Sequence, residues 1–465
     1  MSSGIFPINS DGNKGSYREL IVSSIKKKST VYAIVALSLL NIALLTNTLH
    51  RAQNSVQRVS TGHPTLSPRP PNVRANATEF IKPQNVVISG LVFYGRPDRV
   101  QSMRCYVDVC HFLAAKILGT KEVGTGWRLK EGDDILKVML TTRLLIQRNL
   151  VNNDGWLDEV LWVVNTENKD DLKYLDEVLA SSPRYKKLDL GKKVRGPEFR
   201  QIWKHLERGK IYVKIDDDVV WLADDAIPRI VDRKLRHPND FAVSANIINN
   251  PPLSFIHYHV GALHPYFPEL EGGKLSAKVS NNTSWKPSEH PDWEGPDNFE
   301  WALDALPPAK GHRWLRVKDD KAIVRTPVTH LKYEMWGDTY TSWAIAAQQH
   351  YSFLENLEKD RLDLYKFNLP WNMDNERIRI NLLAIWSDDI LDSNIDSWPK
   401  ERSDEEMVVM ELPKMYSRPV QIVGEALAAH FNFQHQPGVA ETDLLSRYSS
   451  LARERSCLQK STPES

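Results

Sequence analysis

This chain has few cysteines and almost no net charge. Its 465 residues include three cysteines, too few for a domain that depends on disulfides. Cys105 and Cys110 stand five apart in a segment with a helical pattern, where helical rise alone separates them by about 7.5 Å, and we expect no bridge between them. Sixty basic and 59 acidic residues leave a net charge of +1, which excludes the basic footprint of a nucleic-acid-binding protein.

Long uncharged apolar runs are also rare, and the one at residues 31–49 is as long as a bilayer-spanning helix requires. It lacks a secretory cleavage site, so it indicates a retained anchor. Three lysines at 26–28 precede it, and the positive-inside rule therefore leaves residues 1–30 in the cytosol as a tail. A buried core helix is the alternative, but no patterned segment nearby could pack against it. We expect the rest of the chain to be lumenal or extracellular.

Residues 50–84 contain five prolines among Ser, Thr and Asn. Such a composition cannot bury a core and forms an extended, semi-rigid stem. Glycosylation acceptor tripeptides at Asn76, Asn281 and Asn282 are consistent with a lumenal chain. We assign residues 85–455 to one lumenal domain and residues 456–465 to a polar tail.

Strand and helix patterns alternate through the first half of this domain, which predicts an α/β fold with parallel strands in a doubly wound sheet. From about residue 250 to 343 the pattern fails, because Pro, Gly and Asn interrupt a Trp-rich stretch that is too irregular for a sheet layer. The expected strands are 86–94, 159–164, 185–190 and 211–215, and the expected helices are 103–118, 134–150, 170–179, 198–207 and 223–231.

The apolar strand at residues 211–215 stops at three consecutive carboxylates. Side-chain alternation sends Asp216 and Asp218 to one side and Asp217 to the other. The outer two can therefore share one divalent cation, and oxygen ligands suit Mg²⁺ or Mn²⁺. An acidic turn that caps the next helix is the alternative. A buried strand with carboxylates at its C-terminal end favours the metal, since open α/β sheets bind ligands there.

Two enzyme classes place an Asp-x-Asp motif at such a strand end. In a nucleotide-sugar glycosyltransferase, a metal bridges the donor diphosphate and acts as a Lewis acid. In a haloacid-dehalogenase-type phosphatase, Asp216 would be the nucleophile, and Asp388 with Asp389 would resemble the second acidic strand end. The position of the Asp-x-Asp motif within the domain favours the glycosyltransferase. About 130 residues of βα material precede Asp216, whereas the nucleophile strand of the phosphatase opens its domain.

The chain resembles GT-A fold glycosyltransferases of the Golgi-resident, type II kind. The resemblance rests on the strand at 86–94, on KIDDDVVWL at 214–222, on a carboxylate-rich helix start and on a late histidine. The chain also resembles a group of largely uncharacterised fungal proteins through LDEVLWVVNT, YVKIDDDVVWL and INLLAIWSDDI. Over residues 85–455 the resemblance implies a Rossmann-like, mixed, mostly parallel sheet flanked by helices, after a single N-terminal transmembrane helix, and it implies a Golgi membrane location.

The resemblance assigns Asp216 and Asp218 to the metal, and Asp216 and Asp217 to the donor. In this family a histidine near the C-terminus completes the metal shell. His430 is the best match, and His435 is the near alternative. An imidazole beside two carboxylates suits Mn²⁺, whereas a lone histidine on an apolar strand is commonly a core residue.

An acidic pair at a helix start beneath the acceptor is also implied, and Asp404 with Glu405 matches it. In an inverting enzyme, a carboxylate there takes the proton of the attacking acceptor hydroxyl. Ser403 and Glu406 at the same helix start are typical of a capping box, so a structural role stays open. The acidic pair at residues 388–389 is the rival choice for the base.

Tyr94, Gly95 and Arg96, at the end of the first strand, occupy the place where the base and diphosphate of the donor would lie. Gly95 permits a close backbone approach, and Arg96 offers a fork of donors to phosphate. A β-turn with Pro97 explains the same residues.

The Trp-rich stretch is expected to cover the donor or frame the acceptor, because sugars stack on aromatic rings. Amide side chains at residues 246–250 are candidates for binding sugar hydroxyls. His257, His259 and His264 follow closely, but no cysteine accompanies them, and a zinc site is not favoured.

The sequence therefore predicts a metal-dependent, hexosyltransferase-like glycosyltransferase of the secretory pathway. Its cofactor is Mn²⁺ or Mg²⁺, its donor is a UDP- or GDP-linked sugar, and its acceptor is a glycan or glycoprotein. One N-terminal helix contacts the membrane, and no nucleic acid is a partner. The alternatives are the phosphatase and a non-catalytic lumenal glycan-binding protein that kept the fold.

Overall fold

The computed structural model describes residues 80–94, 149–153, 155–279, 281–282 and 284–457. The expected cytosolic tail, anchor and nearly all of the stem lie outside these ranges, as do most of the two helices expected between residues 103 and 150. Gly95, Arg96 and the cysteines at 105 and 110 lie outside them too. Within the described ranges, none of the helices has the length and apolar character that a bilayer crossing needs.

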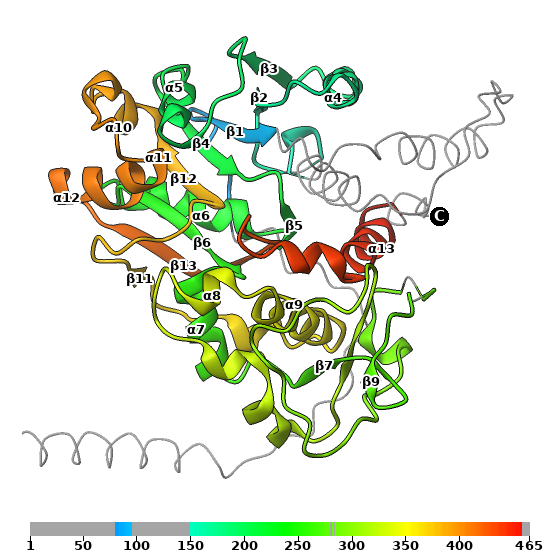
Figure 1. The fold of residues 1–465 in the computed structure, drawn as a ribbon. Coiled ribbons are helices and arrows are strands. Elements are labelled where there is room, and N and C mark those ends of the chain that lie inside the picture. Colours follow the sequence, from blue (N-terminus) through cyan, green and yellow to red (C-terminus); the bar gives the residue numbers. More distant parts are fainter. Residues whose placement is uncertain (1–79, 95–148, 154, 280, 283, 458–465) are drawn as a thin grey trace, which may run out of the picture. The chain divides into compact units, whose positions relative to one another are not determined.

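A nine-stranded mixed sheet organises the described chain (Figure 1). Its order is β11-β13-β6-β12-β4-β1-β2-β3, and β5 pairs with β13. The pairings make β1, β2, β3, β4, β6 and β13 parallel to one another, whereas β5, β11 and β12 run the opposite way. The expected mixed, mostly parallel α/β sheet is therefore confirmed. The strands are β1 (Val87–Tyr94), β2 (Glu159–Val164), β3 (Tyr185–Asp189), β4 (Lys210–Ile215), β5 (Val219–Leu222), β6 (Ala242–Ile248), β11 (Trp371–Asn372), β12 (Leu382–Trp386) and β13 (Val420–His430).

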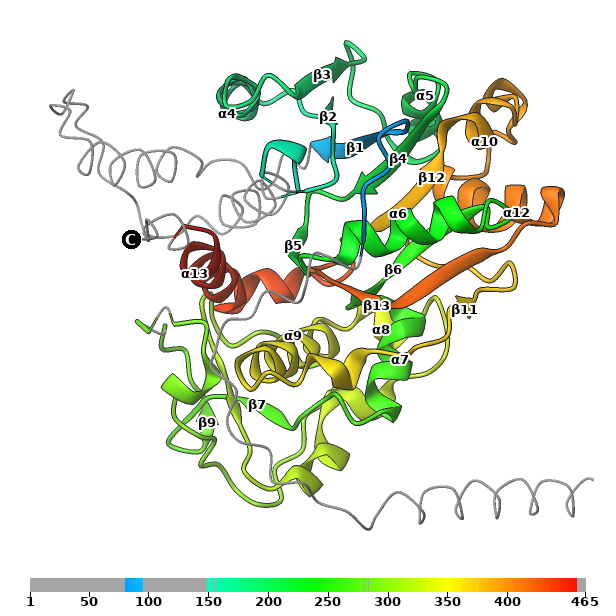
Figure 2. The same ribbon diagram turned by 180° about the vertical axis from the view of Figure 1, so that it is seen from behind.

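Helices flank this sheet, and α6 (Ala226–Arg236) packs across β6, β12 and β13 (Figure 2). Its apolar residues Ile227, Ile230 and Val231 recur at helical spacing and are fully buried against the strands. The remaining helices near the sheet are short, apart from α4 beside β3. They are α4 (Lys169–Ala180), α5 (Arg200–Trp203), α7 (Pro251–His259), α10 (Ser387–Leu391), α11 (Asp404–Glu406) and α12 (Leu412–Tyr416).

The Trp-rich stretch builds a second hydrophobic core around α9 (Trp343–Glu358). Residues 343–357 of this helix are all buried, and the tryptophans that surround it fill the core, so their rings are not available to stack on a sugar. Trp336 is the exception, because its side chain is 50% exposed. The buried rings are Trp285, Trp293, Trp301, Trp314 and Trp343. The other elements here are β7 (Tyr266–Pro268), β8 (Leu270–Glu271), β9 (Lys274–Leu275), β10 (Trp314–Arg316), α8 (Asp338–Thr341) and α13 (Leu444–Cys457).

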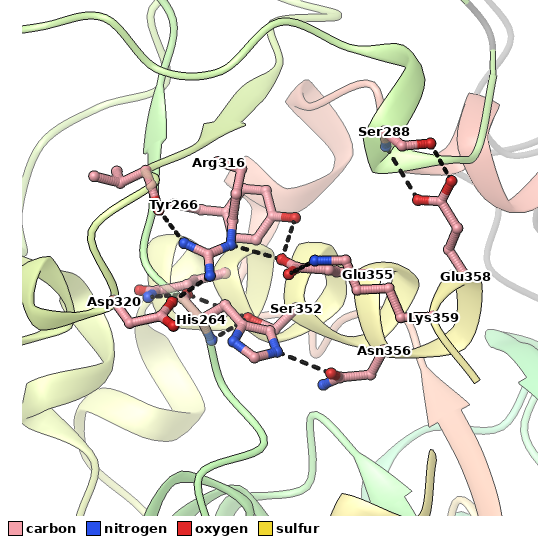
Figure 3. Close-up of polar contacts among 12 residues, drawn as sticks. His264, Tyr266, Ser288, Arg316, Asp320, Ser352, Glu355, Asn356, Glu358 and Lys359 are labelled. Atoms are coloured by element: carbon pink, nitrogen blue, oxygen red, sulfur yellow. Dashed lines mark hydrogen bonds and ion pairs between the residues drawn. The ribbon is translucent and has the colours of Figure 1, made fainter. Parts of the chain in front are cut away.

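One buried carboxylate ties α9 to the strands of this second core (Figure 3). Glu355 is 2% exposed, and its Oε2 accepts hydrogen bonds from Tyr266 Oη at 2.9 Å and from Arg316 Nε at 2.8 Å. Lys359, one turn further along the helix, donates to Glu355 Oε1 at 2.7 Å. A buried charge is tolerated when it is paired and hydrogen-bonded in this way. The cluster is therefore a structural clamp.

Two expected elements differ from the structure. The helix expected at residues 198–207 is a 3₁₀ turn, Gly196–Phe199, followed by the single-turn helix α5, before Gly209, at a φ of 76°, leads into β4. Residues 219–222, between the three aspartates and the helix expected at 223–231, form β5, because they pair antiparallel with β13. The helix follows as α6 and begins at Ala226. Local patterning did not reveal this pairing, since its partner lies some 200 residues away in sequence.

Candidate metal site

The three aspartates lie in the turn that joins β4 to β5, at the carboxyl edge of the parallel strands. The amide of Val219 donates to the carbonyl of Asp216 at 3.3 Å and closes this turn. Pairing of β5 with β13 sets Val219 opposite His430, at a register shift in the ladder, and Phe431 N donates to Asp218 O at 2.9 Å. The β5–β13 pairing therefore brings the late histidine to the aspartate turn.

Asp216, Asp218 and His430 offer ligand atoms that all lie within 4.8 Å of one another. Among the described residues, no other group of three or more His, Cys, Asp or Glu side chains converges in this way. His430 Nε2 lies 3.1 Å from Asp218 Oδ1, and both side chains are 1% exposed. Two carboxylates and an imidazole form a donor set that fits Mn²⁺. The predicted metal ligands thus meet in one place.

Lys214 and Asn381 hold Asp216 from two sides, and the sequence reasoning missed both. Asn381 Nδ2 donates to Asp216 Oδ2 at 2.9 Å. Lys214, whose side chain is 4% exposed, donates to Asp216 Oδ1 and also to the carbonyl of Ile380, at 2.8 Å. A lysine two residues before Asp216 in an otherwise apolar strand lies on the same strand face. That spacing of two residues in the sequence could have indicated that Lys214 contacts Asp216.

The acidic helix start at residues 404–406 forms the predicted capping box. Ser403 Oγ accepts from the amide of Glu406 at 3.2 Å, and Glu406 Oε2 accepts from the amide of Ser403 at 2.9 Å. Asp404 is buried and accepts from Trp203 Nε1 at 3.0 Å. Burial raises the pKa of Asp404, against the opposing effects of Trp203 and of the Lys214 charge. Lys214, which acts electrostatically on Asp404, also contacts Asp216, so the helix start lies close to the aspartate turn.

Glu405 is engaged by two arginines. Its Oε1 accepts from Arg377 Nε at 2.7 Å and from Arg379 Nη1 at 2.8 Å. The guanidinium of Arg379 lies against three aromatic rings. One of these rings, Phe433, also packs on His430, with ring centroids 4.4 Å apart. Glu405 therefore holds arginines beside the metal ligands. The guanidinium carbon of Arg379 lies 4.4, 4.2 and 5.5 Å from the ring centroids of Trp336, Tyr340 and Phe433.

Asp388 and Asp389 lie at the opposite edge of the sheet from Asp216. Strand β12 runs antiparallel to β4, with Trp386 beside Ile211. Four residue steps along β4, roughly 13 Å, separate that pairing from the end of the strand. The same direction of β12 removes the acidic strand end that a haloacid-dehalogenase site would require. The two carboxylates are instead paired locally, with Arg208, the amide of Gly209, Lys234 and Arg418.

Tyr94 and Asp217 are not part of the group of candidate metal ligands. Tyr94 Oη donates to the carbonyl of Asp171 in α4 at 2.7 Å, so this hydroxyl is used within the fold. Burial, followed by the Asp171 charge, raises the pKa of Tyr94, and Asp217 contributes to the same shift. The hydroxyl proton of Tyr94 is therefore already engaged and is not available to a nucleotide sugar. His435 is exposed and packs on Tyr340, with ring centroids 5.0 Å apart, so it is not part of the metal group.

The three earlier histidines do not converge. His257 Nε2 lies 2.7 Å from Asn246 Oδ1, whereas His264 Nε2 lies 2.8 Å from Asn356 Oδ1. His259 packs on the ring of Phe255. The amide side chains of Asn246, Asn249 and Asn250 are fully buried, and each donates through Nδ2 within the fold.

Comparison with known proteins finds structural similarity only. No protein-family model and no curated protein match the chain. Among solved structures, 4-diphosphocytidyl-2C-methyl-D-erythritol synthase from Anaerococcus prevotii is similar over 80% of this chain and 97% of its own, at 9% identity and a TM-score of 0.31. GalNAc-T7 with UDP, GalNAc and Mn²⁺ is similar over 75% of this chain and 44% of its own, at 10% identity and a TM-score of 0.32. These scores are too low to support a function.

Proposed function

We propose that the chain is a metal-dependent glycosyltransferase with a GT-A fold, which transfers a sugar from a UDP- or GDP-linked donor to a glycan or glycoprotein. One observation carries the proposal: Asp216, Asp218 and His430 converge within 4.8 Å at the carboxyl edge of a mixed α/β sheet. Open α/β sheets bind their ligands at this edge. The antiparallel direction of β12 weighs against the phosphatase alternative.

In this proposal Asp216, Asp218 and His430 hold Mn²⁺ or Mg²⁺, which when bound supplies Lewis-acid stabilisation to the departing diphosphate. Lys214 and Asn381 fix the Asp216 carboxylate in its ligating orientation.

Asp404 takes the proton of the acceptor hydroxyl as it attacks the anomeric carbon. A buried carboxylate with a raised pKa is a stronger proton acceptor than an exposed one. Glu405, the second predicted residue of this pair, keeps Arg377 and Arg379 in place through its Oε1.

A screen of the detergent-solubilised full chain against UDP- and GDP-sugars with Mn²⁺ tests the proposal. We expect one donor to bind, and Asp216→Asn or Asp218→Asn to weaken Mn²⁺-dependent donor binding at least tenfold, or about 1.4 kcal/mol. Asp297→Asn, at an exposed carboxylate, is the matched control and should bind normally. Donor affinity that is unchanged in both site variants would reject the metal assignment.

Two other results would redirect the assignment. Hydrolysis of simple phosphate monoesters with Mg²⁺, lost in Asp216→Asn, would favour the phosphatase. Donor or glycan binding without any turnover would favour the non-catalytic glycan-binding protein.

The same proposal includes a Golgi membrane location with residues 1–30 in the cytosol. The uncharged run at 31–49 and the lysines that precede it support this orientation. In sealed microsomes the large domain should resist added protease. Its digestion without detergent would overturn the orientation.

A further inference from the structure

Arg379 combines a buried cation with unused hydrogen-bond donors. Its side chain is 9% exposed, and Nη1 donates to Glu405 Oε1 at 2.8 Å. Nε and Nη2 are buried and have no hydrogen-bond partner among the described residues. Leaving such donors unsatisfied costs about 1–3 kcal/mol each, and more on a charged group. Such groups are few in native proteins, and a functional role or a bound ion is among the explanations for them.

These free donors belong to a side chain that lies next to the candidate metal site. Along residues 377–381, Ile378 and Ile380 are buried in the core of the sheet, while Arg377, Arg379 and Asn381 alternate with them. Asn381 contacts Asp216, and two residues of extended chain span only about 6.6 Å. Arg379 therefore starts one side-chain position away from the residue that holds a metal ligand.

A second contact brings the Arg379 guanidinium itself toward the metal ligands. The centroid of the Phe433 ring lies 5.5 Å from the central carbon of that guanidinium, and the same ring also packs against His430. Two independent paths, through Asn381 to Asp216 and through Phe433 to His430, thus connect Arg379 to the same site.

The contacts that Arg379 already makes leave one edge of the guanidinium for a ligand. The ring centroids of Trp336 and Tyr340 lie within 4.4 Å of its central carbon, so both rings interact with the cation. Glu405 accepts the hydrogen bond from Nη1. Glu405 is shared with Arg377, so it is not a dedicated counter-ion. The remaining donors, Nε and Nη2, form the planar fork that matches a carboxylate or phosphate with two parallel hydrogen bonds.

We propose that Arg379 binds an oxyanion of the substrate through Nε and Nη2, beside the metal ligands. The oxyanion is a phosphate of the donor diphosphate or an acidic group on a sugar. This identification rests on the proposed function, whereas oxyanion binding at Arg379 does not require it. Arg379 is then a specificity-determining residue that the sequence motifs did not indicate.

Titration calorimetry of the full chain with three nucleotide-free probes tests this site: inorganic pyrophosphate, glucose 6-phosphate and glucuronate, each with and without Mn²⁺. We expect Arg379→Gln to weaken at least one probe tenfold or more. Loss for pyrophosphate alone identifies the donor diphosphate as the source. Loss for glucose 6-phosphate or glucuronate identifies an acidic sugar.

Arg377→Gln is the matched control, because Arg377 bonds to the same Glu405 oxygen, while its Nη1 lies 3.4 Å from Glu406 Oε1. It reports the effect of disturbing Glu405 and its surroundings without removing the Arg379 fork, and we expect less than a threefold loss. Equal effects of the two substitutions on all three probes would overturn the proposal. So would unchanged binding in Arg379→Gln.

Arg379→Lys covers the case in which the glutamine variant does not fold. Lysine keeps the cation among the aromatic rings but lacks the planar fork, so affinity should still fall at least threefold, and full affinity would overturn the proposal. The two proposals can also fail separately. If Mn²⁺ has no effect and no nucleotide sugar binds, but Arg379→Gln still loses a probe, only the proposed function fails.

Discussion

Asn381 and Asp216, 165 residues apart, form a two-way contact. Asn381 Nδ2 donates to Asp216 Oδ2 at 2.9 Å, and the amide of Asp216 donates to the Asn381 carbonyl at 2.9 Å. The contact exists because β12 runs antiparallel to β4, so the residue that precedes β12 reaches the carboxyl edge of β4. It fixes both the backbone and the carboxylate of a candidate metal ligand.

Asn381→Ala should therefore weaken Mn²⁺ binding by roughly 10–100-fold, the usual effect of removing a partner that orients a metal ligand. The fold should survive, because the backbone hydrogen bond remains. Calorimetric titration with Mn²⁺ measures the change, and Asn298→Ala, at an exposed asparagine, is the control. Equal Mn²⁺ affinity in both variants would show that Asp216 needs no support from Asn381.

Sequence patterns located the two aspartates of the candidate metal site because they have a strong local context. An apolar strand that ends in aspartates indicated Asp216 and Asp218, and the resemblance to a family supplied His430. The strand bounds of β2 agree with the expected ones, since periodicity and turn residues define them locally. These features depend on a few neighbouring residues, which the sequence displays directly.

The partners of these ligands could not be predicted, because they depend on strand direction and long-range pairing. The antiparallel course of β12 separates Asp388 from the site and brings Asn381 into it, and no local pattern records that direction. The alternation of arginine and isoleucine before β12 shows that Arg379 lies on the opposite face from the buried isoleucines, but not what Arg379 faces. The sequence does not separate Trp336, which is half exposed beside Arg379, from the tryptophans that fill the second core, because a core and a sugar site use the same residue type.

Glu355→Gln should destabilise the second core by about 3 kcal/mol, since it leaves the largely buried Arg316 beside an uncharged group and removes the partner of Lys359. Glu358→Gln is the matched control on the same helix. Among the described residues its carboxylate bonds only to Ser288, at the surface, and we expect less than 1 kcal/mol (Figure 3). Denaturant unfolding of both variants gives the comparison. Similar losses for the two would mean that the Glu355 cluster is not a clamp.

The Glu355 cluster should also make stability depend on pH. Burial alone would raise the pKa of Glu355, but His264, Lys359 and Arg316 together hold the pKa below its usual value. A carboxyl with a lowered folded-state pKa stabilises the fold above its unfolded pKa, and this contribution is lost as the pH falls through the folded value. The melting temperature of the parent should therefore fall more steeply below about pH 4.3 than that of Glu355→Gln. Parallel curves would contradict this.

His257 predicts a second pH dependence, in a higher range. Burial lowers its pKa to about 3. Between pH 6.5 and 3 the unfolded chain therefore binds a proton that the folded chain does not, and stability falls as the pH falls. The loss from this residue between pH 6.5 and 5 is about 2 kcal/mol. His257→Gln, which keeps a donor for Asn246, should lose less stability over that range than the parent, whereas His330→Gln, at an exposed histidine, should follow the parent. A parent-like slope in His257→Gln would exclude the buried histidine as the cause.

Asp404 and Ser403 stand side by side at one helix start, and their substitutions should separate chemistry from capping. Asp404→Asn removes the proton acceptor but keeps an oxygen for Trp203 Nε1, so the fold should remain intact. We expect transfer to fall by roughly 10² or more with normal donor affinity, because the proton moves only during sugar transfer.

Ser403→Ala removes the capping bond to the amide of Glu406 and should cost about 1 kcal/mol of stability, while turnover per folded molecule stays near the parent value. Glu405→Gln tests the other member of the acidic pair. If it lowers turnover like Asp404→Asn but also weakens binding of the nucleotide sugar, its effect passes through Arg377 and Arg379. Both arginines donate hydrogen bonds to Glu405. If Asp404→Asn and Glu405→Gln only lower the melting temperature, this helix start is structural. The acidic pair at residues 388–389 would not replace it, because those carboxylates lie at the other edge of the sheet.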